Sequence, residues 1–274
     1  MLERAAEIIG KAEVFIITAG AGMGVDSGLP DFRGNQGFWQ AYPPYARLGV
    51  SFVDTANPVH FERNPTFGWG FYGHRLNLYR STIPHEGFSI IRRWIERNSA
   101  VYYVITSNVD GQFQKAGFSE ERIVEVHGSI HHLQCLKPCS NLIWPNDEEI
   151  SVDTTSMHSL SVPSCHRCGG ISRPNILMFG DWSWLSERTS AQESRFEHFQ
   201  ETLGNKQIAV IELGAGTAIP TIRATSERLG WHHPHATVVR INPREPEILS
   251  PHISLACNAL DGLQKIDRIL ARHS

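Results

Sequence analysis

The chain has 274 residues, of which 41% are hydrophobic, with a formal net charge of −3 and a pI near 6.5. This length and apolar content are enough for the core of one large domain, or of a large domain with a smaller insert. The weak net charge gives no electrostatic case for nucleic acid or an anionic membrane as a partner.

The amino-terminal residues predict no secretory or membrane segment. Residues 1–11 contain four charged side chains, and the apolar run Val14–Thr18 is too short for a signal-peptide core or a membrane span. We therefore expect a cytoplasmic protein whose five cysteines do not form structural disulfides.

Alternating strand and helix patterns predict an α/β fold with a doubly wound, Rossmann-like parallel sheet. Apolar, β-branched runs predict buried strands at Val14–Thr18, Val101–Thr106, Ile208–Leu213 and Thr237–Ile241. Amphipathic patterns predict helices at Ser89–Arg97, Thr221–Leu229 and Leu263–Arg272. In such folds ligands bind at the carboxyl ends of the strands.

The stretch Gly20–Arg33 follows the first predicted strand and begins with four glycines in nine residues. Glycine permits positive φ and a close approach of backbone N–H groups to a phosphate, and a following helix adds a favourable dipole. This order is typical of dinucleotide-binding folds. Val25 occupies the third glycine position of G-x-G-x-x-G, which disfavours a generic dehydrogenase.

Two stretches interrupt the alternation and predict a smaller, helical and zinc-binding lobe. Residues 35–80 are rich in aromatic residues, proline and glycine, and residues 131–173 hold four of the five cysteines. We assign residues 1–34, 81–130 and 174–274 to the large lobe of a single domain that spans 1–274.

Four cysteines form two close pairs, Cys135 with Cys139 and Cys165 with Cys168. Four thiolates in two such pairs suit a tetrahedral, structural Zn²⁺. The alternative is four unrelated reduced cysteines, and three histidines are substitute ligands: His131, His132 and His166. Cys257 stands apart, and we expect it to be a buried hydrophobe.

Within the first insert, Asn64-Pro65 is typical of an N-cap followed by proline at the first helical position, which predicts a helix from Pro65 to about Arg80. Tyr72 and Arg75 then share one helix face, so a phenol and a guanidinium converge on one spot. The alternative is an exposed arginine beside a packing tyrosine.

Polar residues follow two strands. Asn108 and Asp110 come after Val101–Thr106, and they suit either recognition of a ribose hydroxyl and an amide or the cap of a helix. His127 lies at the end of a short strand at Ile123–Val124, before a glycine. Histidine titrates near neutral pH, so His127 is a natural general base.

Five features occur in the order found in sirtuins, and the chain resembles a sirtuin over residues 12–262. They are Gly20-Ala-Gly-x4-Ser27-Gly-Leu-Pro-Asp-Phe-Arg33, Thr106-x-Asn-Val-Asp110-Gly, Val126-His-Gly-Ser129, the two cysteine pairs, and Arg173-Pro-Asn-Ile-Leu-Met-Phe-Gly-Asp181. The resemblance implies a Rossmann lobe, a small lobe that carries structural zinc, and NAD⁺ bound in the cleft between them.

The resemblance also implies roles for individual residues. Those expected to contact NAD⁺ are Gly20, Ala21, Gly22, Asp31, Phe32, Arg33, Ser107, Asn108, Asp110, Gly214, Gly216, Thr217 and Asn242. Among them, Gly20–Gly22 hold the pyrophosphate, Asp31–Arg33 form a mobile cofactor loop, and Asn108 and Asp110 face the nicotinamide and its ribose. His127 is the implied base, and together with Asn108 and Asp110 it makes up the catalytic set.

In the sirtuin reaction, the acyl oxygen of a modified lysine attacks C1′ of the nicotinamide ribose and nicotinamide leaves. The implied role of His127 is to help the 2′-hydroxyl attack the resulting imidate, which leads to free lysine and O-acyl-ADP-ribose. Phe179 and Gly180 resemble the edge against which the acyl-lysine peptide pairs as an added strand.

Sirtuins that accept succinyl, malonyl or glutaryl lysine carry Tyr-x-x-Arg at the position of Tyr72 and Arg75, where the pair binds the distal carboxylate. The resemblance therefore implies a deacetylase that also removes succinyl and malonyl groups. A guanidinium and a phenol are chemically suited to a carboxylate.

The chain departs from the sirtuin pattern at three places. Gly24 stands where serine is usual, Ser107 stands where glutamine is usual, and Gly214-Ala-Gly-Thr217 replaces a late Gly-Thr-Ser. Two other functions stay open: ADP-ribosyl transfer or NAD⁺ hydrolysis, and an NAD⁺-sensing module with weak catalysis.

Overall fold

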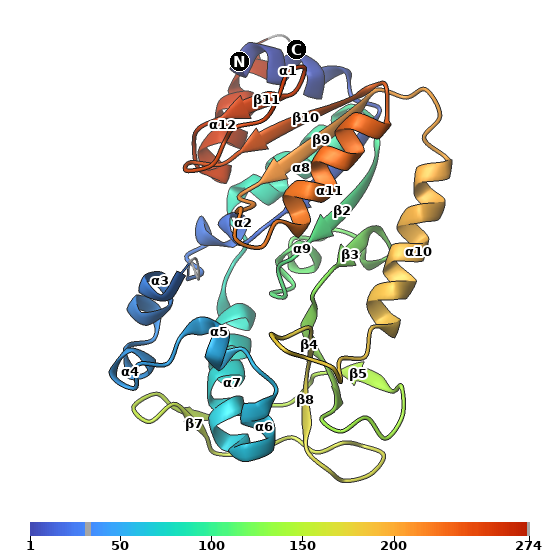
Figure 1. Cartoon of the computed structure of the whole chain (residues 1–274). Helices are drawn as coiled ribbons and strands as arrows, with labels where there is room; N and C mark the ends of the chain where they lie inside the picture. The colour runs from blue at the N-terminus through green and yellow to red at the C-terminus, as the bar shows by residue number, and fades with distance from the viewer. Residues whose placement is uncertain (31–33, 273–274) are drawn as a thin grey trace.

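The computed structural model describes residues 1–30 and 34–272, and it places the chain in two lobes, with both termini at the far end of the larger one (Figure 1). The large lobe is built on a six-stranded parallel sheet in the order β11-β10-β9-β1-β2-β3. Its strands are β1 (Val14–Ala19), β2 (Val101–Thr106), β3 (Ile123–Glu125), β9 (Ile208–Leu213), β10 (Ala236–Ile241) and β11 (Ile253–Leu255). This is the strand order of a Rossmann fold, so the predicted fold class is confirmed.

Helices cover both faces of this sheet. One face carries α1 (Leu2–Lys11), α8 (Glu86–Arg97) and α12 (Ala259–Leu270), and the other carries α10 (Glu187–Glu201) and α11 (Thr221–His232). Along β1, Phe15 and Ile17 enter the first core while Val14 and Ile16 enter the second. A strand buried on both faces has no polar side, which is why β1 is a continuous apolar run.

The four predicted strands and the three predicted helices are all present. The helix predicted from Ser89 begins at Glu86, and the carboxy-terminal helix is shifted toward the amino terminus, to Ala259–Leu270. The helix predicted from Pro65 is α7 (Pro65–Ser81), and the Asn64 side chain caps it by accepting the N–H of Phe67. The sequence patterns missed α1 and α10.

The small lobe combines short helices with two small antiparallel sheets. The helices, beside α7, are α3 (Gly34–Ala41), α4 (Pro43–Arg47), α5 (Phe52–Thr55) and α6 (Val59–Arg63). One sheet has the order β5-β4-β8, from β4 (Gly128–Cys135), β5 (Ile143–Pro145) and β8 (Ser172–Ile176), and the other pairs β6 (Val152–Asp153) with β7 (His158–Ser159). An aromatic core holds this lobe together, and its largest members include Phe38, Tyr45, Phe61, Trp69 and Phe71.

Three short elements lie between the main ones: α2 (Gly22–Val25), α9 (Gln112–Lys115) and the 3₁₀ helix η1 (Glu120–Arg122). Within the described residues, no helix is both long and apolar enough to cross a membrane.

The topological switch point of the sheet, where folds of this type bind ligands in a crevice, lies between β1 and β9, because the chain proceeds to β2 on one side and to β10 on the other. The turns that follow these two strands touch each other. The N–H of Gly22 donates to the Gly214 carbonyl at 3.0 Å. Gly214 has a φ of +57°, and a Cβ on it would lie 2.4 Å from the Gly22 Cα.

Gly214→Ala is expected to destabilise the protein more than Gly204→Ala. Both glycines have positive φ, but a Cβ on Gly204, whose φ is +54°, would meet no atom within 4 Å. Gly204→Ala should therefore cost about 1 kcal/mol of backbone strain, and the clash at Gly214 should add about 1–3 kcal/mol. Urea unfolding of the two variants measures the difference. Equal losses of stability would show that the two turns can move apart to accommodate the added Cβ.

Candidate active site

The glycine turn after β1 is held by its contact with the turn after β9. Gly20 donates its N–H to the Leu213 carbonyl at 3.0 Å, and a Cβ on Gly20 would lie 2.8 Å from the Ala215 Cα. Gly20 and Gly214 are thus required by the packing of the turns themselves. Ala21, at the tip of the turn before α2, is exposed on the crevice side of the sheet edge.

Asn108 and Asp110 follow β2 and lie beside this turn. The Asn108 side chain donates to the Gly20 carbonyl at 3.0 Å. Asp110 is only 8% exposed, and its Oδ1 accepts the N–H of Gln112 at the start of α9. The N-cap residue of α9 is Gly111, so the alternative that Asn108 or Asp110 is the N-cap is wrong. A Cβ on Gly24 would lie 3.4 Å from the other oxygen, Oδ2, so the absence of a side chain at Gly24 leaves that oxygen uncrowded.

The surroundings of Asp110 change its acidity. Burial raises the pKa of its carboxyl group to about 6, and the like charge of Glu125 acts in the same direction. The N–H of Gln112 and the charge of Arg75 partly oppose this shift. Asp110 therefore changes charge close to neutral pH, unlike an exposed aspartate.

His127 lies between β3 and β4, at the carboxyl edge of the sheet, and is half-buried. Burial lowers its pKa from the usual 6.5, while a contact with the backbone of Ser107 acts the other way. Ser107 is itself fixed, because its N–H donates to the Ala19 carbonyl at 3.1 Å. The imidazole is therefore neutral at pH 7, which is the form that a general base requires.

Tyr72 and Arg75 are both buried inside the small lobe on α7, so the alternative of an exposed arginine is wrong. The guanidinium carbon of Arg75 lies 5.7 Å from the centroid of the Tyr72 ring and 5.1 Å from that of Phe71. Nε and Nη2 of Arg75 both donate to the Tyr79 hydroxyl, at 2.9 and 2.6 Å. Aromatic rings thus surround the buried cation.

Arg75 and Asp110 lie close enough to affect each other, because the arginine lowers the pKa of the aspartate. Burial raises the pKa of Tyr79, the charge of Asp110 acts in the same direction, and that of Arg75 lowers it. The side-chain amide of Gln112 donates to the Tyr79 carbonyl at 3.2 Å, so this part of α7 packs against the segment that follows β2.

The turn after β9 is closed by residues that follow β10. Asn242 is fully buried, and its amide donates to the Ala215 carbonyl at 2.7 Å. Its side-chain oxygen accepts the N–H groups of Arg244 and Glu245. The Glu245 carboxylate in turn accepts the N–H of Thr217 at 3.0 Å and its hydroxyl. The hydrogen bonds of the buried Asn242 side chain thus fix the conformation of this turn.

The segment after β8 is fixed by a buried ion pair. Arg173 and Asp181 are both fully buried as side chains, with Nη1 and Nη2 donating to the two carboxylate oxygens at 2.6 and 3.0 Å. Between them, the N–H of Phe179 donates to the Ala56 carbonyl at 3.0 Å, and Gly180 turns the chain with a φ of +65°. The segment predicted to pair with the substrate peptide is therefore a short, exposed turn, and the ion pair of Arg173 with Asp181 holds it in place.

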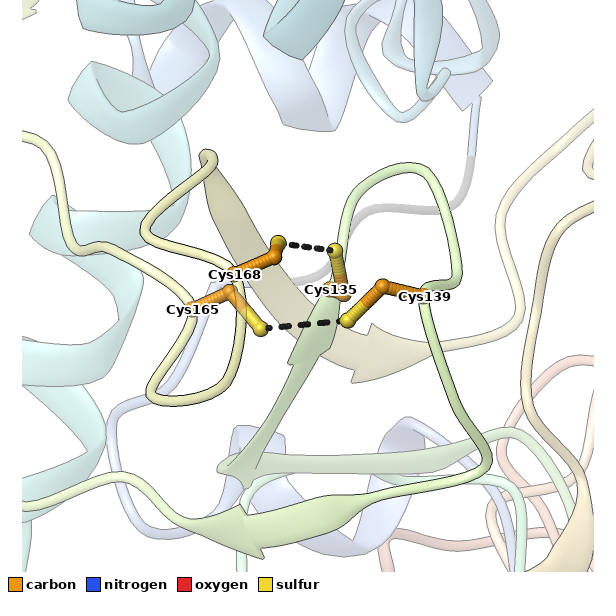
Figure 2. Close-up of side chains that lie close together, drawn as sticks. All are labelled: Cys135, Cys139, Cys165 and Cys168. Atoms are coloured by element: carbon orange, nitrogen blue, oxygen red, sulfur yellow. Dashed lines mark hydrogen bonds between the residues drawn. The ribbon is translucent and has the colours of Figure 1, made fainter.

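The four clustered cysteines converge as predicted, at the ends of β4 and β8 (Figure 2). Their sulfur atoms all lie within 4.8 Å of one another, with 3.7 Å between Cys135 and Cys168 and between Cys139 and Cys165. A tetrahedral Zn²⁺ with bonds of about 2.3 Å places its sulfur ligands about 3.8 Å apart, so the four thiols fit structural zinc. Cys257 is only half-buried and packs at the edge of the large-lobe core.

The family model described as the Sir2 family matches residues 20–201. The chain belongs to the Sir2 family. It is 28% identical over 267 residues to the NAD-dependent protein deacylase of Aeropyrum pernix, which covers 97% of this chain and 96% of that protein.

Solved Sir2 structures have the same fold. A complex of a Sir2 homolog with NAD aligns with a TM-score of 0.72 at 20% identity, over 99% of this chain and 94% of the other. A structure reported on the mechanism and regulation of Sir2 enzymes aligns with a TM-score of 0.70 at 26% identity, over 100% of this chain and 98% of the other.

Two residues that contact the predicted site residues were not predicted from the sequence. Tyr79 lies four residues after Arg75 on one helix. Side chains at this spacing are neighbours, so the contact between them could have been predicted. Glu245 follows the predicted strand at Thr237–Ile241 and was accessible to the same search along strand ends. Asp31, Phe32 and Arg33 lie outside the described residues.

Zinc content tests the cysteine cluster directly. We expect one zinc ion per chain, and we expect Cys165→Ser to lose it and to unfold at a lower temperature, because a structural site contributes its binding energy to folding. Cys257→Ser is the matched control and should keep the metal, since Cys257 is not among the clustered thiols. Elemental analysis of the purified variants measures this, and full zinc in Cys165→Ser would contradict a four-thiolate site.

Proposed function

We propose that this Sir2-family protein is an NAD⁺-dependent protein lysine deacylase, and that acyl groups ending in a carboxylate, such as succinyl and malonyl, are among its substrates. The observation that carries the second part is the burial of Arg75 within a ring of aromatic side chains, on the side of the small lobe that faces Asp110. The relative from Aeropyrum pernix, which matches nearly the whole chain, is named as a deacylase.

NAD⁺ is the co-substrate in this proposal, and it supplies its own leaving group, nicotinamide. The exposed turn at Ala21 and the turn at Gly214–Thr217 border the crevice, and they would hold the pyrophosphate and the adenosine end. Asn108, with its side chain fixed on the Gly20 carbonyl, and the Oδ2 of Asp110 would face the nicotinamide and its ribose. Most of what the chain supplies is orientation.

His127 would act as the general base on the ribose hydroxyls. Its lowered pKa keeps the imidazole neutral at pH 7, and its place at the end of β3 puts it on the same sheet edge as Asn108 and Asp110. The acyl-lysine peptide would pair along the turn at Phe179 and Gly180, which the buried pair of Arg173 and Asp181 holds in place.

The distal carboxylate of a succinyl group would bind to Arg75. Its guanidinium is buried, so a charge-assisted hydrogen bond to a carboxylate is stronger there than at the surface. The Tyr79 hydroxyl, which accepts two bonds from Arg75, holds the guanidinium plane in a fixed orientation. Tyr72 adds a second phenol beside the cation.

His127→Ala is expected to lower the deacylation rate by about 10²–10⁴-fold, the usual contribution of a general base. His198→Ala is the matched control, because His198 is exposed on α10, and this variant should react as fast as the wild type. Mass spectrometry of an acetyl-lysine peptide incubated with NAD⁺ measures both rates. Unchanged turnover in His127→Ala would exclude this residue as the base.

Arg75→Met is expected to lower kcat/KM for a succinyl-lysine peptide by about a hundredfold, the equivalent of two charge-assisted bonds of about 1.5 kcal/mol each. Activity on the matched acetyl peptide should change little. Removing Arg75 also raises the pKa of Asp110, so both activities are compared at about pH 8.5, where that carboxyl group is ionised. A loss of equal size on both peptides would show that Arg75 is structural.

A further inference from the structure

A cavity lies beside the residues that follow β2, and Tyr79 and Asp110 of the site described above form part of its wall. It has a volume of about 290 Å³, at the lower end of the range for small-molecule sites. Its walls come from the end of α7, from α9, from β4 and from the start of α10, and its polar lining includes Arg80, Lys115, His131, His132 and Arg188. None of these five residues has a role in the proposed deacylation.

The lining carries an excess of positive charge. In the part of the chain that the structure describes, neither Arg80 nor Lys115 has a carboxylate within ion-pair distance. Arg80 donates to the backbone carbonyls of Asn146 and Glu148, and Lys115 donates to those of Arg80 and Thr82, the last two at 2.6 Å. Because their partners are neutral carbonyl groups, both side chains keep their net positive charge and can attract an anion.

The acidic residues around the cavity do not neutralise these cations. Asp110 lines the cavity, but its carboxylate makes other contacts, with Oδ1 accepting the N–H of Gln112 and Oδ2 lying near Gly24. Glu125 is already paired with Arg188 at 2.6 Å. Glu120 is exposed on η1 and forms no ion pair with the described residues.

Polar atoms of the same cluster still lack partners. Among the described residues, Nη1 of Arg188, Nδ1 of His132 and Oε1 of Glu125 are buried without a hydrogen bond. Unpaired buried polar atoms are rare and costly, so the donor Nη1 of Arg188 can gain a hydrogen bond when an anion fills the cavity, whereas the acceptor Oε1 of Glu125 cannot. Burial lowers the pKa of His132 to about 4, and the charge of Arg188 acts in the same direction while that of Glu125 opposes it.

We propose that this cavity binds a small polyvalent oxyanion, either a phosphate or a dicarboxylate, through Arg80, Lys115 and Arg188. The bound anion would also contact His131, whose Nε2 is 2.9 Å from the Asp110 carbonyl oxygen. The ligand would therefore rest against Asp110 and Gly111, which line the cavity.

Calorimetric titration with pyrophosphate and, separately, with succinate tests this site and distinguishes the two kinds of anion. At least one of them should bind the wild type, and Lys115→Met should weaken that binding by about tenfold or more, the effect of losing one charge-assisted contact. Lys206→Met is the matched control, because Lys206 lies just before the amino end of β9, whereas the cavity lies near the carboxyl ends of the strands. This variant should bind the anion like the wild type.

Arg75→Met distinguishes binding in this cavity from binding at the active site. If succinate binds to Arg75, this variant should lose the binding, and if succinate binds in the cavity, the variant should keep it. Lys115 is exposed, so its replacement should not disturb folding, and Arg80→Met serves as a second variant with the same expected loss. The proposal is overturned if neither anion binds, or if Lys115→Met and Arg80→Met bind as tightly as the wild type.

Discussion

The contact between the turn after β1 and the turn after β9 is the constraint on which the rest of the site depends. Gly22 bonds the Gly214 carbonyl directly, Asn108 ties the end of β2 to Gly20, and Asn242 ties the end of β10 to the turn after β9. Four neighbouring strand ends are therefore joined at one edge of the sheet. Glycine is required where the backbones touch, and the polar side chains on either side of that contact are positioned with it.

The parts of the fold that the sequence predicted are those where a local pattern and the tertiary environment agree. Strands buried on both faces, such as β1 and β9, must be apolar throughout, so their runs mark them clearly. Asn64 and Pro65 carry a capping signal that needs no partner from elsewhere. The spacing of the cysteines reflects metal geometry, and the sulfur atoms lie where that geometry requires them.

The parts that it did not predict depend on distant contacts. α10 is mostly polar and is held by few buried side chains, among them Phe196 and Phe199, so its pattern is weak. The burial of Arg75 is set by aromatic residues of several helices, and the raised pKa of Asp110 is set by what covers it. The periodicity of one segment carries no information about the burial of Arg75 or the pKa of Asp110. Only the fold decides whether such an arginine lies at the surface or in the interior.

In the proposed reaction, the acyl group leaves lysine for ADP-ribose and NAD⁺ is consumed. Product analysis by mass spectrometry tests it most directly, with the wild-type protein, NAD⁺ and an acetyl-lysine peptide. We expect nicotinamide, free-lysine peptide and O-acetyl-ADP-ribose in equal amounts. Nicotinamide released with unmodified ADP-ribose, or with ADP-ribose attached to protein, would contradict it and would identify an NAD⁺ hydrolase or an ADP-ribosyltransferase instead.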